Sequence, residues 1–106
     1  MSDVHRIRLE GFWKPDGNGV SRSFGRPRTI AADEVIEVVG SCSRNYRIFV
    51  NLERIGEGTA GGFRCSISMP LQVRNAIRIE TEGDVNDVAL EIRHVASTND
   101  LNEPKA

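Results

Sequence analysis

The fold is decided by residues 47–80, RIFVNLERIGEGTAGGFRCSISMPLQVRNAIRIE. Apolar side chains recur at every second position in three parts of this stretch. These side chains are Ile48 and Val50, then Phe63, Cys65, Ile67 and Met69, and finally Ile77 and Ile79. A two-residue period places one set of side chains on a single face of an extended chain. The stretch therefore predicts β-strands, separated by turns such as the glycine-rich residues 56–62.

The same period continues on both sides of this stretch. Ile7 and Leu9 alternate with charged residues near the start, and Val88, Leu90 and Ile92 alternate with Ala89, Glu91 and Arg93 near the end. No window shows the apolar stripe of a helix. We therefore predict an all-β protein, a single antiparallel β-sandwich of jelly-roll type with about eight strands. The expected strands cover residues 4–10, 20–28, 34–40, 45–52, 54–58, 62–69, 76–82 and 88–95.

The composition fits one globular domain. The chain has 106 residues, with 14 Lys and Arg against 15 Asp and Glu, and a formal net charge of −1. We expect one domain over residues 1–96 and a disordered tail over the polar residues 97–106. The balanced charge disfavours sequence-independent nucleic-acid binding. Residues 1–10 lack the apolar run of a signal peptide or membrane span, so we expect a cytoplasmic protein without membrane contact.

Charge and apolar pattern also predict how the first and last strands pair. An antiparallel register that places Arg6 opposite Glu91 also places Ile7 opposite Leu90. The same register brings Leu9 opposite Val88. A cross-strand pair of this kind contributes about 0.2 to 1 kcal/mol, enough to select a register but too little to hold the fold together.

Seven positions of the decisive stretch follow a known pattern. They are Asn51, Gly56, Gly61, Gly62, Phe63, Leu71 and Asn75. With these residues the stretch resembles the galactose-binding-like jelly-roll domains found at the front of family 2 glycoside hydrolases, such as β-galactosidases and β-glucuronidases. The chain departs from that pattern at Leu52, where a hairpin glycine is usual, and over residues 66–68, where an acidic residue is usual. The resemblance implies the sandwich and a carbohydrate-binding-like role, without the barrel domain that carries the catalytic carboxylates.

The single tryptophan is the first candidate for ligand contact. Trp13 lies beside Phe12 in a predicted loop, residues 11–19, where a flat ring suits stacking on a sugar or a base. The alternative is that the ring packs into the core. Residues 16–19 resemble the opening of a calcium loop, but the acidic residue that completes such a loop is missing. We expect a plain turn there, and neither a metal nor a cofactor.

The densest basic cluster is the second candidate. Arg22, Arg26 and Arg28 carry guanidinium groups that suit a carboxylate, a phosphate or an acidic protein surface. Alternatively, they pair within the fold with Glu34, Glu37, Glu80 or Glu82. Phe24, between them, is expected to point inward. We do not expect nucleic-acid binding, because the cluster lacks a run of stacking aromatic rings.

The cysteines and histidines form no complete motif. Cys42 and Cys65 are expected to be free thiols, with a disulfide as the alternative. His5 and His94 share the parity of the buried faces of the first and last strands, so pairing of those strands brings them near one sheet end. A metal shared with a cysteine would need a third ligand that the pattern does not supply. No nucleophile, metal or dinucleotide motif is complete, so no catalytic residue is predicted and we do not expect an enzyme.

The sequence therefore predicts a non-catalytic binding module, carbohydrate-binding-like, that uses loops at one end of the sandwich. Its candidate ligand-binding residues are Trp13, Arg22, Arg26 and Arg28. The alternative is a small interaction or assembly protein that presents an edge strand or the Arg22–Arg28 patch to another protein. The specific ligand, the partner and the oligomeric state stay open.

Overall fold

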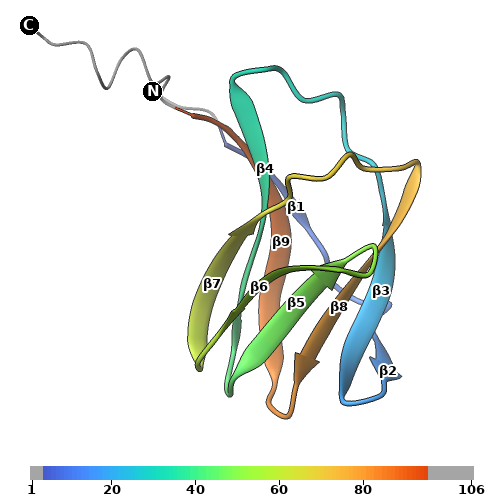
Figure 1. Ribbon diagram of the computed structural model, residues 1–106, viewed down its shortest axis with the longest axis vertical. Coiled ribbons are helices and arrows are strands. Elements are labelled where there is room, and N and C mark those ends of the chain that lie inside the picture. The colour runs from blue at the N-terminus through green and yellow to red at the C-terminus, as the bar shows by residue number, and fades with distance from the viewer. Residues whose placement is uncertain (1–3, 96–106) are drawn as a thin grey trace, which may run out of the picture.

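The computed structural model describes residues 4–95, which form two antiparallel sheets packed face to face (Figure 1). The prediction of an all-β sandwich is confirmed, and the described chain contains no helix. The strands are β1 (Val4–Arg8), β2 (Lys14–Asp16), β3 (Gly19–Gly25), β4 (Glu34–Cys42), β5 (Tyr46–Val50), β6 (Glu53–Gly58), β7 (Gly61–Ser66), β8 (Arg74–Thr81) and β9 (Val85–His94). The predicted tail, residues 97–106, lies outside the described residues.

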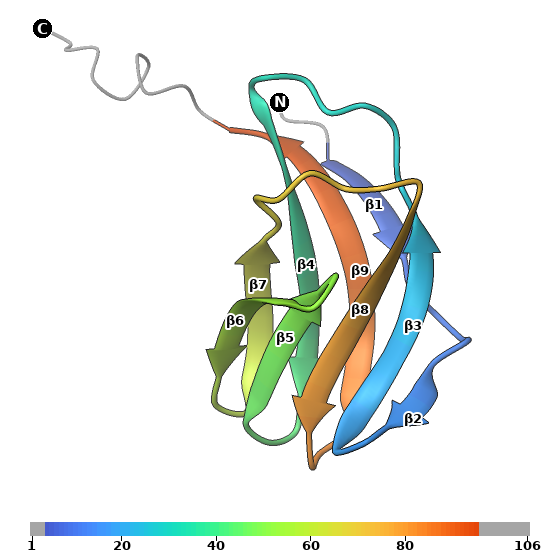
Figure 2. The ribbon, with the colours of Figure 1, turned by 45° about the vertical axis from the view of Figure 1, so that its right-hand side comes forward.

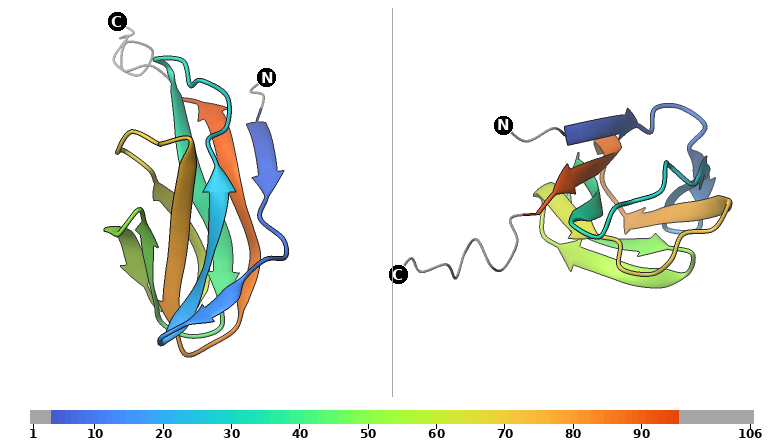
Figure 3. Two further views of the ribbon diagram at one scale, coloured as in Figure 1. Left: turned by 90° about the vertical axis from the view of Figure 1, so that its right-hand side faces the viewer. Right: turned by 90° about the horizontal axis from the view of Figure 1, so that it is seen from above.

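The strands are connected as a jelly roll. One sheet has the order β1-β9-β4-β7 and the other the order β2-β3-β8-β5-β6 (Figures 2 and 3). The pairs β5–β6, β4–β7, β3–β8 and β1–β9 are nested along the chain and alternate between the two sheets, which is the jelly-roll arrangement. The structure adds β2 to the eight predicted strands. This strand has three residues, one of them Pro15, and is too short to show a two-residue period.

The predicted register of the first and last strands is confirmed. Arg6 lies opposite Glu91 and Ile7 opposite Leu90 in the β1–β9 ladder. The Leu9 amide donates to the Val88 carbonyl at 2.9 Å, which continues the same register. Arg6 Nε lies 3.0 Å from a carboxylate oxygen of Glu91. The charge pattern therefore identified the correct pairing.

The core is built from the alternating aliphatic residues. Its largest fully buried side chains are Ile48, Ile77, Ile79, Leu90, Ile92, Val38 and Val50. Burying each such side chain contributes about 1.5 to 3 kcal/mol. Phe24 is also buried and packs in this cluster, as its position between arginines predicted. β3 ends at Gly25, earlier than predicted, because Pro27 cannot continue a ladder.

A two-residue turn joins β5 to β6. Asn51 and Leu52 both have positive φ, 51° and 73°, which is the backbone of a type I′ hairpin. The Asn51 amide group donates to Oδ1 of Asn75 at 2.9 Å, and Asn51 Oδ1 accepts from the Ala76 amide. Asn75 is 2% exposed and also exchanges two 2.8 Å hydrogen bonds with the backbone of Gln72. The two asparagines therefore fasten this turn to the start of β8.

Cys42 and Cys65 are free thiols on neighbouring strands. Cys42 lies opposite Gly61, four residues along β7 from Cys65. At about 3.3 Å per residue the two are about 13 Å apart, beyond the roughly 7 Å reach of a disulfide.

A Cβ at Gly56 would lie 2.3 Å from the Cys65 sulfur, so this glycine allows β6 to approach β7 closely. Gly56 is therefore a position of close contact between the two sheets.

The two histidine side chains lie outside the core, although the two-residue period had placed them on the buried faces of their strands. His5 and His94 are both exposed, because they lie near the ends of β1 and β9. His94 Nδ1 lies 3.0 Å from Oδ2 of Asp33. His94 pairs with Glu34 at one end of β4, while Cys42 lies at the other end. Within residues 4–95 no three metal-binding side chains gather, and no helix is long and apolar enough to cross a membrane.

Candidate binding site on the five-stranded sheet

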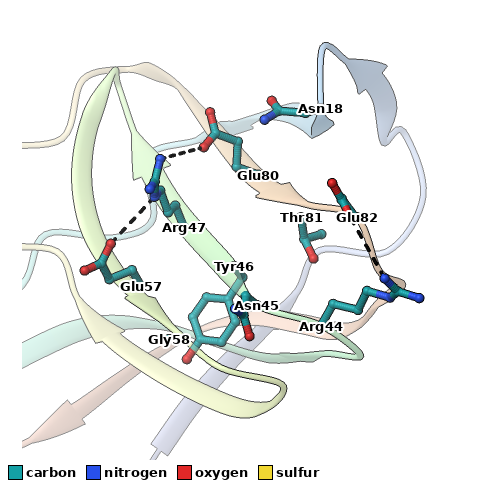
Figure 4. A pocket seen from close by; sticks show the side chains of 10 residues that line it. All are labelled: Asn18, Arg44, Asn45, Tyr46, Arg47, Glu57, Gly58, Glu80, Thr81 and Glu82. Atoms are coloured by element: carbon teal, nitrogen blue, oxygen red, sulfur yellow. Dashed lines mark ion pairs between the residues drawn. The ribbon is translucent and has the colours of Figure 1, made fainter.

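A polar groove of about 980 Å³ opens at one end of the five-stranded sheet (Figure 4). It lies where β5 begins, where β6 and β8 end, and where the turn from β2 to β3 passes. Its lining combines guanidinium, carboxylate, amide and hydroxyl groups with one aromatic ring. These residues are Asn18, Arg44, Asn45, Tyr46, Arg47, Glu57, Gly58, Glu80, Thr81 and Glu82. We call this surface the polar groove.

Arg47 occupies the centre of the polar groove between two carboxylates. In the ladder it lies opposite Glu57 on one side and Glu80 on the other. Its Nε is 3.7 Å from Glu57 and its Nη1 is 3.6 Å from Glu80. These separations exceed the roughly 2.7 to 3.2 Å of a hydrogen bond. The guanidinium is held in place by charge, yet it keeps hydrogen-bonding capacity for another molecule.

The Glu80 side chain is fixed from the opposite side by Arg78. Arg78 Nη1 donates to Glu80 Oε2 at 2.7 Å, and Arg78 Nη2 donates to Oδ1 of Asn18 at the same distance. The Arg78 guanidinium also lies over the ring of Phe49, 5.9 Å from its centroid. Glu80 and Asn18 are therefore held in position before any ligand arrives, which lowers the entropy lost on binding.

Tyr46 supplies the aromatic ring at the edge of the polar groove. Its ring packs against Phe63 with centroids 5.2 Å apart. The ring lies across Gly58, where a Cβ would come within 2.5 Å of the Tyr46 hydroxyl oxygen. Burial, together with the nearby thiols of Cys65 and Cys42, raises the pKa of Tyr46. The hydroxyl therefore keeps its proton at neutral pH and can donate it in a hydrogen bond.

At the mouth of the polar groove, Arg44 and Glu82 form a loose pair. Their charged atoms are 3.9 Å apart and both side chains are largely exposed. Beside them, the Thr81 hydroxyl oxygen accepts from the Gly83 amide at 3.0 Å, so its own proton stays available. The groove lining includes neither histidine nor cysteine. Its chemistry is therefore that of hydrogen bonding to a polar ligand.

Trp13, the first residue predicted to contact a ligand, lies elsewhere. It is half-buried and packs against the core, and its indole N–H donates to the Leu9 carbonyl at 2.8 Å. These contacts correspond to the packing role that the sequence left as the alternative. The ring that faces solvent is its neighbour Phe12, which is 82% exposed and has a φ of 63°.

Arg22 supports the Phe12 loop. Its Nη1 donates to the carbonyls of Glu10 and Gly11 at 3.1 and 3.0 Å, and its guanidinium lies 5.6 Å from the centroid of the Phe12 ring. A third hydrogen bond, from Arg22 Nε, goes to the Ser23 carbonyl at 3.1 Å. The structure thus places Arg22 under a loop, away from the polar groove.

Arg28 and Arg26 lie in the segment after β3. Both Nη atoms of Arg28 donate to the carboxylate of Glu34 at 2.8 Å, as the internal-pairing alternative predicted. The hydrogen bond from Arg28, aided by the Ala31 amide, lowers the pKa of Glu34 to about 2. Arg26 is exposed, and its amide donates to the Val73 carbonyl. The three predicted arginines are therefore not brought together with Trp13 in one pocket.

The sequence alone did not identify the polar groove. Arg47 and Glu80 each have the outward parity of an ordinary solvent-facing strand residue, and only the order β8-β5-β6 makes them neighbours. A search for opposite charges at the matching ends of predicted strands would have suggested the pair. No family model and no curated protein matches this chain, so the resemblance to galactose-binding-like domains stays a prediction.

Proposed function

We propose that this protein is a non-catalytic binding module that holds a carbohydrate or a similar polyhydroxylated ligand in the polar groove. The observation that carries the proposal is the placement of Arg47 between Glu57 and Glu80 at 3.7 and 3.6 Å. A hydroxyl group both accepts and donates hydrogen bonds. Neighbouring hydroxyls on a sugar ring can accept from the guanidinium while donating to the carboxylates beside it.

The rest of the polar groove supports this class of ligand. Asn18 and Asn45 offer amide groups, and Tyr46 offers a ring edge with a protonated hydroxyl. Ligand sites for small molecules combine a few placed polar groups with apolar or aromatic surface. The mixed charge of the lining, with Arg44 and Arg47 against three glutamates, favours a neutral ligand over a strongly charged one.

The way in which the carboxylates are engaged supports a binding role. Glu80 accepts a 2.7 Å hydrogen bond from Arg78, and Glu57 lies 3.3 Å from Arg54. The lining contains neither histidine nor cysteine, two of the side chains that commonly act as a base or a nucleophile. Arginine-bound carboxylates serve instead as fixed acceptors for hydroxyl protons.

The proposal is tested by titrating the protein with a panel of neutral and acidic oligosaccharides, using calorimetry on the wild type and two variants. Arg47→Ala removes the central donor, and we expect at least one sugar to lose affinity by about tenfold, the effect of one good charged hydrogen bond. Arg54→Ala is the matched control, because Arg54 also pairs with Glu57 but does not line the groove. Equal losses in both variants, or no binding by any sugar, would contradict the proposal.

A further inference from the structure

The sandwich has four edge strands, and three of them carry features that prevent pairing with another strand. β1 presents Arg6 and Arg8, and β2 is three residues long with Pro15 at its centre. β6 is interrupted by a register shift opposite Ile48 and Phe49 and carries two glutamates. Charged residues, proline, short length and bulges are the usual protections of exposed sheet edges.

β7, at the outer edge of the four-stranded sheet, has fewer of these protections (Figure 2). Its six residues, GGFRCS, contain no proline, and its ladder with β4 runs without a register shift. Gly61 and Gly62 place no side chain in the way of an approaching strand. Its one charge, Arg64, is already paired within the chain with Glu37 and Glu91 at 2.7 and 2.9 Å.

The outer edge of β7 also has free backbone groups. The Ile67 amide donates to the Ile36 carbonyl, so residues 61, 63, 65 and 67 direct their amides toward β4. The alternating residues Gly62, Arg64 and Ser66 direct theirs away from the sheet. Within residues 4–95 the side chains and loops offer these three amides no hydrogen-bond partner. An unpaired edge of this kind is a template for another strand.

We propose that β7 of one copy pairs antiparallel with β7 of a second copy, which joins the two four-stranded sheets into one continuous sheet. A symmetric dimer needs a surface that is complementary to itself. A two-fold axis at Phe63 satisfies this requirement, because it sets Arg64 of each copy opposite Gly62 of the other. An axis at Arg64 would instead place two arginines directly opposite each other, which is unfavourable.

This register makes a second prediction about Cys65. The axis at Phe63 places Cys65 opposite Gly61 of the second copy, so the partner's backbone lies beside a thiol that is partly exposed in the monomer. The dimer therefore slows alkylation of Cys65, whereas Cys42 is buried in either state. The dimer interface lies apart from the polar groove, whose lining contains no residue of β7.

The experiment measures the dimer dissociation constant by sedimentation equilibrium for the wild type, Gly62→Lys and Gly62→Glu. A Cβ at Gly62 has space, with its nearest neighbour, the Gly40 carbonyl oxygen, at 3.7 Å. Lysine there would oppose Arg64 of the second copy and glutamate would pair with it, twice in each dimer. We expect the glutamate variant to dimerise about tenfold more tightly than the lysine variant. Equal constants for the two variants would overturn the proposed register.

A proline pair tests the strand contact itself. Gly62→Pro removes an outward-facing amide and should shift the protein toward monomer. Arg8→Pro does the same at the open edge of β1 and should leave the dimer unchanged. The proposal is overturned if the wild type is monomeric at every concentration up to about 1 mM, the weakest association worth calling specific. It is also overturned if Arg8→Pro dissociates the dimer while Gly62→Pro does not. Arg47→Ala should still dimerise, which separates this test from that of the polar groove.

Discussion

Glu37 and Glu91 face each other directly across the β4–β9 ladder, and both are almost fully buried, at 5% and 8% exposed. Two like charges in this position repel each other. The outer face of the four-stranded sheet resolves the conflict with arginines. Arg93 donates to both carboxylate oxygens of Glu37 at 2.9 and 3.1 Å, and Arg64 donates to Glu37 and Glu91 at 2.7 and 2.9 Å. This sheet face is therefore held together by charge.

Arg64 contacts both glutamates of this cluster, so its removal leaves the repulsion between Glu37 and Glu91 less compensated. We expect Arg64→Ala to lower the free energy of unfolding by about 2 to 4 kcal/mol, because it leaves two almost fully buried carboxylates with one arginine fewer. Chemical denaturation measures the loss. Adding Glu91→Gln should recover part of it, since one of the two opposing charges is then gone. Arg8→Ala, which breaks an exposed 3.5 Å pair with Glu10, should change stability by less than about 1 kcal/mol.

Acid should weaken the fold through Glu34. The pKa of Glu34 in the folded protein is about 2, against an ordinary value of 4.5, chiefly because Arg28 donates to it. The stabilisation is complete above the unfolded value and is lost as the pH falls from 4.5 toward 2. Glu37, whose pKa Arg93 also lowers, adds to the same trend. Glu34→Gln should flatten the dependence of unfolding free energy on pH in this range, which chemical denaturation at a series of pH values measures.

The turn between β5 and β6 offers a stabilising substitution. Leu52 is 95% exposed and holds a φ of 73°, a conformation that costs a residue with a side chain about 1 to 2 kcal/mol. Leu52→Gly removes this strain, partly offset by glycine's greater freedom in the unfolded chain, and should stabilise the protein by about 0.5 to 1 kcal/mol. Val73→Gly is the control, because Val73 is also exposed but has no positive φ. A lower thermal midpoint for Leu52→Gly would contradict this account of the turn.

Close packing between β6 and β7 should make Gly56 intolerant of even one methyl group. Gly56→Ala would place its Cβ 2.3 Å from the Cys65 sulfur, and we expect a loss of about 1 to 3 kcal/mol in unfolding free energy. The double variant Gly56→Ala/Cys65→Ala should be destabilised by less than the sum of the two single variants, because the smaller side chain makes room. Strict additivity of the two losses would show that the sulfur is not the obstacle.

The sequence was sufficient for the fold wherever alternation and charge acted together. Ile7 and Leu90 could be paired in advance because a one-residue slip would have turned the apolar residues to the wrong face. The two-residue period predicted the wrong environment for His94. This residue is exposed, because it lies at the end of β9, where the opposite sheet no longer covers it. β2 also escaped prediction, because three residues around a proline carry no periodic signal.

The candidate site was harder to predict than the fold. Trp13 and Phe12 are neighbours in sequence, and the choice of which ring packs inward depends on the backbone, where Gly11 and Phe12 both have positive φ. Arg47 and Glu80 are far apart in sequence and become neighbours only through the jelly-roll strand order. Predicting which outward-facing polar residues are neighbours thus requires the strand order, whereas predicting which apolar residues are buried does not.

The central claim is that the polar groove binds a polyhydroxylated ligand around Arg47. The most direct measurement is the change in backbone amide chemical shifts as an oligosaccharide that binds in calorimetry is added to the labelled protein. We predict that the largest shifts fall on Asn45, Arg47 and Thr81 and that Arg47→Ala needs about tenfold more sugar to reach the same shifts. Shifts centred instead on Phe12 and Trp13, with the groove amides unchanged, would contradict the claim.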